Sequence, residues 1–453
     1  MLSRRVFLKN ATAVSLGFSG LHTFMGCSSE DNRGDLDLLV PDPNGILDLP
    51  ANFTYSIISE AGNPMTDGFI VPGRPDGMAT FLAENGLTIL VRNHEIDNAA
   101  STGPFGADNQ FLSQVTSDQF YDFGFGNKPA VGGTTTIVYD TEKKEVVQEF
   151  LSLVGTRRNC AGGPTPWGSW ITCEETTVRA GDDIEKDHGY NFEVPATLAP
   201  AIAAPIPLKA MGRFNHEAVA VEPNSGIVYQ TEDRHDGLIY RFIPNVPGQL
   251  AEGGRLQALA IIDRASLDTR NWDSQEVAVG QSFAVRWIDL EDIDAPEDDL
   301  RLRGFEQGAA RFARGEGMWY GEGTIFFACT NGGEKRKGQI WKYIPSPAEG
   351  TPQEDQQPAS LELFIEPNDG AIIENADNLT IAPWGDLIVC EDGPGKQHLL
   401  RVTPAGDVIL FGANRVSDSE FAGSTFSPDG STLFVNIQVD GLTLAITGPW
   451  NTF

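Results

Sequence analysis

Cysteine and acidic side chains stand at matching places in a repeated sequence pattern. Each copy has a short β-type run, a turn rich in Pro, Asp, Asn and Gly, and a second β-type run that ends in polar or acidic residues. Turns that contain Asn-Gly or Asp-Gly are typical of tight β-hairpins, so the pattern predicts six hairpins. The copies begin at Gly77, Cys160, Glu217, Glu316, Asn378 and Ala422.

The geometry of a hairpin places the start of its first strand beside the end of its second strand. Cys160 is therefore expected near Glu174 and Glu175. For the same reason, Glu217 is expected near Glu232 and Asp233. If these are the inner strands of one assembly, their ends meet at one mouth of a central channel. The predicted site then holds one thiolate, several carboxylates and amide oxygens.

This predicted site has a charge problem that bound cations would solve. Many carboxylates cannot all stay ionised at close range, because like charges disfavour one another. Oxygen ligands suit calcium, whereas a thiolate beside carboxylates suits iron or zinc better. The residue types therefore predict a metal site at the channel mouth. For any single position, a solvated channel acid is the alternative.

The elements that must position these residues form a β-rich chain. Six irregularly spaced hairpins, with further strand material between them, predict an all-β fold, namely a six-bladed β-propeller with irregular insertions between the blades. The longest insertion spans residues 246–315, and a small helical segment is expected near 300–314. A β-sandwich is the alternative. One propeller catalytic domain is expected over residues 46–453.

The N-terminus has the features of an export signal. Residues 3–9 (SRRVFLK) carry the paired arginines of a twin-arginine (Tat) signal, and a weakly apolar stretch follows. The signal is expected over 1–27, and Cys27 is a candidate for a lipid anchor. Residues 28–45 are expected to form a tether. The predicted location is the periplasm or the extracellular space, with the Tat export machinery as a partner and membrane contact only through lipid on Cys27.

Charge and cysteine content exclude several classes of protein. The chain has 63 acidic and 32 basic residues, for a net charge of −31. This field would repel nucleic acid and anionic membrane surfaces, so no nucleic-acid binding is expected. Beyond the signal there are four cysteines without a CxxC pair, which is too few for a disulfide scaffold. Cys173, Cys329 and Cys390 lie in apolar runs and are expected in the core.

Several segments, taken together, resemble the PhoX-type alkaline phosphatases. They are 158–168 (RNCAGGPTPWG), 172–175 (TCEE), 214–219 (FNHEAV), 329–331 (CTN), 93–95 (NHE), 421–430 and 445–450. The resemblance extends over nearly the whole mature chain. It implies Tat export, a β-propeller, and hydrolysis of phosphate esters by an iron and calcium cluster in which a cysteine ligates iron.

The resemblance also implies roles for single residues. Cys160 is similar to the iron-ligating cysteine, and Glu217 and Glu316 are similar to cluster carboxylates. The basic residue that binds phosphate is expected among Arg314, Lys335 and Arg336, with Arg314 assigned to the catalytic set. The other metal ligands that the resemblance implies are Glu174, Glu391, Asp392 and Glu95.

The predicted function is that of an exported phosphatase that hydrolyses small phosphate esters at alkaline pH. Iron and calcium in the central channel would bind phosphate oxygens and activate the attacking oxygen, with Cys160 as a ligand and not a nucleophile. Two alternatives remain. A calcium-dependent lactonase-like propeller hydrolase would need no thiolate, and a non-catalytic exported scaffold would need no site.

Overall fold

The computed structural model describes residues 39–97, 102–126 and 128–450, which belong to one compact unit. The expected signal and residues 28–38 of the expected tether lie outside the described residues. Within the rest of that tether, β1 (Leu39–Val40) pairs antiparallel with β2 (Leu47–Pro50). Among the described residues, no helix is long and apolar enough to cross a membrane.

Strands dominate the described residues, and the one α-helix among them is α1 (Leu300–Glu306). The helix is shorter than expected, because the chain turns at Gly308, which has φ +108°, and then joins isolated β-bridges near Arg311. Short 3₁₀ turns are found at Leu112–Gln114, Ser117–Gln119, Gly124–Gly126, Lys209–Met211, Leu250–Glu252 and Glu354–Gln356.

Six antiparallel hairpins form the inner part of the molecule. Their first strands are β4 (Pro75–Leu82), β8 (Asn159–Pro164), β11 (His216–Val221), β16 (Gly315–Gly321), β20 (Ala376–Ile381) and β24 (Phe421–Phe426). Their second strands are β5 (Thr88–His94), β9 (Ser169–Glu174), β12 (Val228–Glu232), β17 (Thr324–Cys329), β21 (Leu387–Glu391) and β25 (Thr432–Ile437). Each first strand contacts the first strand of the next hairpin, and β24 contacts β4, so the six strands close a ring.

Outer strands extend these hairpins into five sheets within the described part of the chain. The outer strands are β3 (Thr54–Glu60), β6 (Gly132–Asp140), β7 (Glu145–Thr156), β10 (Asn191–Pro195), β13 (Ile239–Pro244), β14 (Gly254–Ile261), β15 (Ser282–Asp289), β18 (Gln339–Ile344), β19 (Ala359–Ile365), β22 (His398–Val402), β23 (Val408–Asn414) and β26 (Leu442–Thr447). The sheet orders are β4-β5-β6-β7, β8-β9-β10, β24-β25-β26-β3, β1-β2-β23-β22-β21-β20, and a nine-stranded sheet that runs from β11 to β16.

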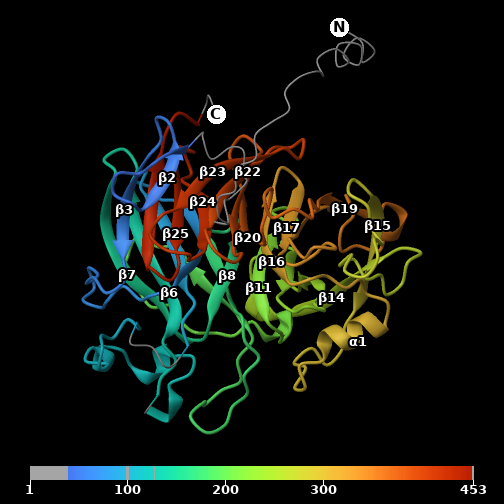
Figure 1. Cartoon of the computed structure of the whole chain (residues 1–453). Helices are drawn as coiled ribbons and strands as arrows, with labels where there is room; N and C mark the ends of the chain where they lie inside the picture. Colours follow the sequence, from blue (N-terminus) through green and yellow to red (C-terminus); the bar gives the residue numbers. More distant parts are fainter. Residues whose placement is uncertain (1–38, 98–101, 127, 451–453) are drawn as a thin grey trace, which may run out of the picture. The chain divides into compact units, whose positions relative to one another are not determined.

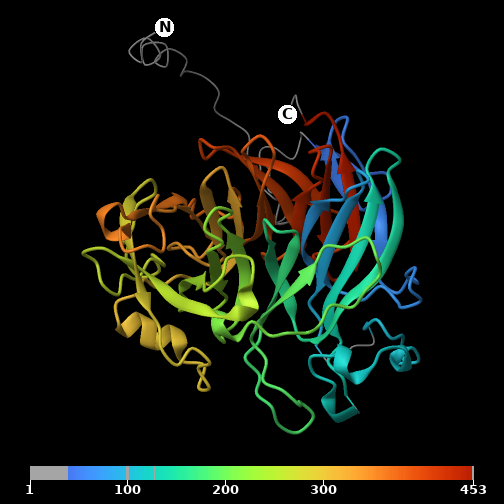
Figure 2. The same cartoon turned by 180° about the vertical axis from the view of Figure 1, so that it is seen from behind.

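The fold is therefore all-β and propeller-like, and the expectation of six separate blades is met in part. Two hairpins share the nine-stranded sheet, because β15 pairs with both β14 and β19 and so joins their outer edges. The N-terminal strands complete C-terminal sheets: β3 pairs with β26, and β2 pairs with β23. Figure 1 and, from behind, Figure 2 show these blue strands among the red ones.

Glycine makes the hairpin turns tight. All six turns between first and second strands contain a glycine with φ between +70° and +97°, a region that other residues rarely adopt. These glycines are Gly86, Gly168, Gly226, Gly323, Gly385 and Gly430.

The hydrophobic core lies between the faces of neighbouring sheets. One cluster joins Cys173 of β9 to Val219 of β11 and Tyr240 of β13. Cys329 and Cys390 are fully buried in two further clusters of the same kind. The prediction that these three cysteines are core residues is confirmed, and all four described cysteines are free thiols.

Candidate metal centre

Each of the six hairpins presents three backbone positions to the same end of the ring. We call them the entry position (the residue before the first strand), the inner position (the second residue of that strand) and the exit position (the residue after the second strand). In every hairpin the exit N–H donates to the entry carbonyl, at 2.9 to 3.2 Å. Local backbone geometry therefore repeats six times around one axis of the site.

The side chains at these positions line one pocket of about 190 Å³. From the entry positions come Arg158, Arg314 and Glu420. From the inner positions come Asp76, Cys160, Glu217, Glu316 and Asp377. From the exit positions come Glu95, Glu175, Asp233, Asp392 and Gln438. These are all the residues that line the pocket.

A β-bulge aims each inner side chain. The pairing register shifts between the first or second residue of each first strand and the residue three further on, in all six hairpins. A bulge disrupts the ladder locally and redirects a side chain. The inner residues Cys160, Glu217 and Glu316 thus face the pocket, although the strands around them are buried in the sheet.

Most of the predicted site residues do meet in this pocket. Cys160, Glu217 and Glu316 lie at inner positions, and Arg314 lies at an entry position. Glu95 and Asp392 occupy exit positions. Lys335 and Arg336, the other two basic residues considered for phosphate binding, are not among the pocket's lining residues.

Glu174 and Glu391 must be corrected, because both face away from the pocket. Each is the last residue of its second strand, so the next residue points to the opposite face and reaches the pocket instead. Glu174 accepts hydrogen bonds from the buried His188 Nδ1 (2.6 Å) and from the Gly189 N–H (2.9 Å). Glu391 accepts the Glu374 N–H (2.7 Å) and lies 3.0 Å from His398 Nδ1.

Five acids of the pocket are not among the predicted ligands: Asp76, Glu175, Asp233, Asp377 and Glu420. Hairpin geometry does place Glu175 near Cys160 and Asp233 near Glu217, but it says nothing of the other three. A signal for one of them is present in the sequence. Cys160 precedes the turn glycine Gly168 by eight residues, and eight residues before Gly385 stands Asp377, not the neighbouring Asn378. This count does not hold in every hairpin, since Glu217 precedes Gly226 by nine residues and Glu316 precedes Gly323 by seven. Glu420 carries no such signal, since it lies before its strand.

Acidic groups outnumber basic groups in the pocket by nine carboxyls to two guanidiniums. Arg314 pairs with Asp233 (2.6 Å) and Glu316 (2.8 Å). Arg158 pairs with Glu95 at 2.8 Å and also with Glu175. Two guanidinium charges cannot balance nine ionised carboxylates. Full ionisation of the pocket would therefore require several further positive charges.

Burial and mutual repulsion shift the titration of these groups. Burial, followed by the charge of Glu175, raises the pKa of Glu217 well above its usual range. Burial, opposed by Arg158 and assisted by Asp233, raises the pKa of Glu175 to about 8. Burial, together with Asp392, raises the pKa of Asp377 to about 7. The pocket therefore holds protons unless other cations replace them.

Among the residues that the structure describes, three overlapping groups of side chains could each hold a metal ion. They are Cys160–Glu175–Glu217, Glu217–Glu316–Asp377 and Asp377–Asp392–Glu420, and in each group the ligand atoms lie within 4.8 Å of one another. Glu217 and Asp377 belong to two groups each, as bridging ligands between neighbouring ions would. Asp377 Oδ1 is buried and accepts no hydrogen bond from any described residue. This unpartnered oxygen fits a bound cation.

The chemistry of the donors differs between the three groups. Two groups offer carboxylate oxygens alone, the ligands that calcium prefers. The third adds the thiol of Cys160, which suits a transition metal such as iron or zinc. Burial, followed by the charge of Glu217, raises the pKa of the Cys160 thiol well above its usual range, so only a nearby cation would make it a thiolate.

The fold and site define a class: an all-β, propeller-like protein whose central acidic pocket has side-chain groups that could hold metal ions. The model of the family described as alkaline phosphatase PhoX matches residues 35–441. The chain belongs to this family, and it is accordingly a phosphoric ester hydrolase. This assignment replaces the lactonase and scaffold alternatives. A search of curated proteins found no match.

Solved structures show likeness in fold. Pseudomonas fluorescens PhoX in complex with vanadate, a transition-state analogue, is 19% identical, with 89% of this chain and 96% of that chain covered and a TM-score of 0.65. A gluconolactonase from Xanthomonas campestris is 11% identical, with 88% and 97% covered and a TM-score of 0.39. The first of these supports the propeller-like fold described above.

Proposed function

We propose that this protein is an exported phosphatase that hydrolyses phosphate esters at alkaline pH with an iron and calcium cluster in the acidic pocket. The observation that carries the proposal is the set of three overlapping ligand groups, one with a thiol and two with oxygens alone. In this proposal, Cys160, Glu175 and Glu217 hold iron. Glu316, Asp377, Asp392 and Glu420 complete the oxygen-rich sites for calcium.

The bound cations would supply positive charge for the phosphate oxygens and would activate the attacking water. The residues of the chain hold these parts in place. Arg314 donates from Nε (2.6 Å) and Nη2 (2.9 Å) to the carboxylate of Asp233. These two hydrogen bonds fix the guanidinium at the pocket wall, where it can bind a phosphate oxygen. Cys160 is 4% exposed and acts as a ligand, since an enclosed thiol is poorly placed to attack.

Glu95 has a supporting role in this proposal. Its carboxylate pairs with Arg158 (2.8 Å) and accepts a hydrogen bond from Gln438 (3.0 Å), and it belongs to none of the three ligand groups among the described residues. Gln438 also donates to Asp76 (2.7 Å). These contacts join the polar side chains of this part of the pocket wall and hold Arg158 beside the proposed iron ligands.

The remaining parts of the proposal concern fold and location. We count the propeller as six-bladed, supported by the six hairpins and the sixfold repeat of entry, inner and exit positions. Residues 1–27 direct Tat export to the periplasm or beyond, Cys27 is a candidate lipid anchor, and 46–453 form one catalytic domain. The net charge supports small phosphate esters as partners and disfavours nucleic acid.

One experiment tests the function. Protein purified without chelator is analysed for metals and assayed on a phosphomonoester, a phosphodiester and a lactone, each with and without a calcium chelator. We expect iron and calcium in the protein, and phosphate ester hydrolysis that rises toward alkaline pH and stops with chelator. Lactone turnover with inert phosphate esters, or full activity in metal-free protein, would refute the proposal.

A further inference from the structure

The loop between β17 and β18 carries the longest run of consecutive cationic residues in the sequence, Lys335, Arg336 and Lys337. This run is unexpected in a chain of net charge −31. Among the described residues, Lys335 pairs with Glu334 (2.7 Å) and Lys337 pairs with Glu374. Arg336 takes part in none of the ion pairs of the described residues, so its charge is available to a ligand.

Arg336 is held against a tryptophan from a different loop. Its guanidinium carbon lies 4.3 Å from the ring centroid of Trp272, and that of Arg270 lies 4.1 Å from the same centroid. Trp272 Nε1 donates to the Asn331 carbonyl (2.7 Å), and Asn331 Nδ2 lies 2.9 Å from His235 Nδ1. We call these five residues the Trp272 cluster. The ring stacks with both cations and restricts where they point.

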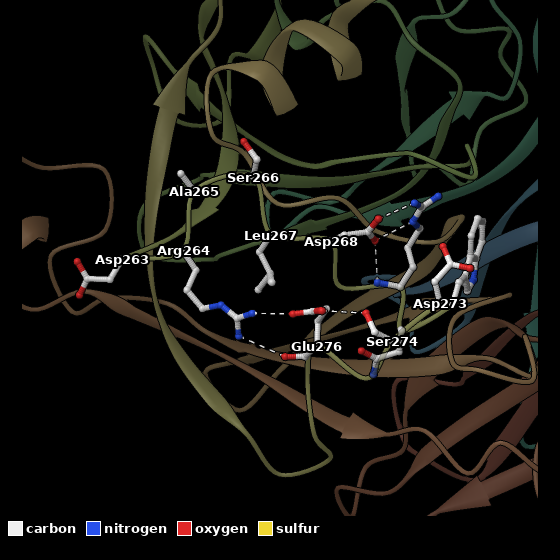
Figure 3. Close-up of a pocket in the computed structure, with 12 residues that line it drawn as sticks. Asp263, Arg264, Ala265, Ser266, Leu267, Asp268, Asp273, Ser274 and Glu276 are labelled. Atoms are coloured by element: carbon white, nitrogen blue, oxygen red, sulfur yellow. Dashed lines mark hydrogen bonds and ion pairs between the residues drawn. The ribbon is translucent and has the colours of Figure 1, made fainter.

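The two guanidiniums of the cluster differ in their charge balance. Arg270 is neutralised by Asp268, to which it donates from Nε (2.7 Å) and Nη2 (2.5 Å), and Figure 3 shows this carboxylate in the loop. Arg336 is exposed and has no ion-pair partner among the described residues. The cluster thus presents one fixed, unneutralised guanidinium to solvent, and guanidinium is well suited to carboxylate and phosphate.

Hydrogen bonds connect this cluster to the rim of the acidic pocket. His235 follows the pocket residue Asp233 by two positions. Asn375 Nδ2 donates to the Arg336 carbonyl (3.2 Å), and the Asn375 carbonyl accepts the N–H of Asp392, another pocket residue. The cluster therefore lies beside the mouth at which a phosphate ester would enter.

Space for a ligand is present next to the cluster. Arg270 and Trp272 also line an open cavity of about 550 Å³ in the loop 263–276, shown in Figure 3. Four acidic side chains and two arginines line this cavity, and Arg336 is not among its lining residues. Cavities of roughly 300–1,000 Å³ are typical of small-molecule sites. Because acids outnumber bases in this cavity, the anion would be held at Arg336 outside it, and only an uncharged part of the leaving group would extend into this space.

We propose that the Trp272 cluster binds a second anionic group, carried by the alcohol part of the substrate, so that the preferred substrates are phosphate esters whose leaving group bears its own carboxylate or phosphate. The inference rests on the proposed function, because it assumes that one phosphate occupies the acidic pocket. Arg336 would make the contact with the anion, and Trp272 would position it.

A matched pair of substrates tests the proposal. Glycerol phosphate and phosphoglycerate are both phosphomonoesters, but only the second has a carboxylate on the alcohol part. We expect metal-loaded protein to have the higher kcat/KM for phosphoglycerate. In Arg336→Gln, the ratio of the two kcat/KM values should fall about tenfold, as expected for loss of one charge-assisted hydrogen bond. Trp272→Leu should lower the ratio in the same direction.

Lys335→Gln is the control, since it removes the same charge from the same loop at a side chain paired with Glu334. We expect it to leave the ratio unchanged. If Arg336→Gln and Lys335→Gln change the ratio equally, the effect comes from the overall charge of the loop and the proposal is overturned. An Arg336→Gln protein with the wild-type ratio would overturn it as well.

A binding measurement separates this inference from the proposed function. Glycerate is titrated calorimetrically into metal-loaded protein that is saturated with inorganic phosphate, so the pocket is filled and no turnover occurs. Weaker glycerate binding by Arg336→Gln than by the wild type supports the cluster even if no ester is hydrolysed. Equal binding refutes the cluster and leaves the phosphatase proposal intact.

Discussion

At the scale of single residues, Cys160 is the side chain whose role distinguishes an iron site from a calcium site. Its Sγ lies 3.4 Å from the His216 carbonyl and in the same ligand group as Glu175 and Glu217. Cys173 is a buried thiol on the second strand of the same hairpin, but it is not among the residues that line the acidic pocket. The two cysteines therefore form a matched pair for substitution.

We expect Cys160→Ala to abolish bound iron and phosphatase activity. The free energy of unfolding of metal-free protein should change by only about 1 kcal/mol, because one small buried group is removed. Iron analysis, activity and chemical denaturation measure these effects. Cys173→Ala should keep iron and activity; a Cys160→Ala protein that retains iron would contradict the assignment.

Glu217 belongs to two of the three ligand groups, and Glu316 lies with it in the middle group. Glu217→Gln and Glu316→Gln keep the side-chain size but remove the charge, so each should lower metal content and reduce kcat by about 100-fold or more. Metal-free protein should become no less stable, because burial already makes the ionised form unfavourable there. Glu291→Gln, at an exposed acid of the surface, should behave as wild type.

At the scale of elements, the alternation along the second strands separates structural from pocket acids. Glu174, Glu232 and Glu391 each end a strand and bond to the next strand or the loop before it. The following residues, among them Glu175 and Asp233, enter the pocket. Anchoring the end of the strand therefore also orients the pocket acid.

Substitutions at the adjacent residues Glu174 and Glu175 should consequently affect different properties of the protein. Glu174→Gln breaks a buried contact with the imidazolium of His188, whose pKa is raised to about 9 by Glu174 and Asp122 against the effect of burial. We expect a loss of about 2 kcal/mol or more in stability, measured by denaturation of metal-free protein. Glu175→Gln should cost metal and activity without this loss. Equal phenotypes would refute the alternation.

At the scale of the whole molecule, the acidic pocket makes stability depend on pH in a way that metal should reverse. Glu175 has a pKa of about 8 and Asp377 a pKa of about 7, both raised by burial first. A raised pKa means that the folded chain holds protons that the unfolded chain releases. The contribution of these two groups to the free energy of unfolding is therefore fully present near pH 4, and it is lost as the pH rises through 7 and 8.

We therefore expect the Tm of metal-free protein to fall between about pH 5 and pH 8. Metal binding needs ionised ligands, so the rise in Tm on adding calcium and iron should grow over the same range. Thermal scans at a series of pH values, with and without metals, measure both trends. A metal-free Tm that increases steadily toward pH 8 would contradict this view of the pocket.

The net charge of −31 should slow the approach of anionic substrates. Raising the salt concentration to about 0.15 M shortens the screening length to roughly 8 Å, so kcat/KM for a phosphomonoester should increase by about twofold. Steady-state assays over a salt series at constant metal concentration check this. A monotonic decrease would mean that the local cations near the mouth outweigh the overall charge.

The sequence by itself determined the β-hairpins, their number and the chemistry of the site. Glycine turns and alternating apolar runs act locally, so Cys160, Glu217 and Glu316 could be found at the starts of strands. Short sequence motifs also indicated the family, whose model matches residues 35–441. These features depend on a residue and its near neighbours in the chain.

Only the tertiary structure decided which of two adjacent acids enters the pocket. Glu174 and Glu175 are the same residue type at adjacent positions. Because successive side chains of a strand point to opposite faces, Glu174 faces the sheet interface and Glu175 faces the candidate metal site. Asp377 and Glu420 come from different hairpins yet share a ligand group. Their meeting depends on the bulges and on closure of the ring, which bring together strand ends far apart in sequence, and no local pattern encodes those distances.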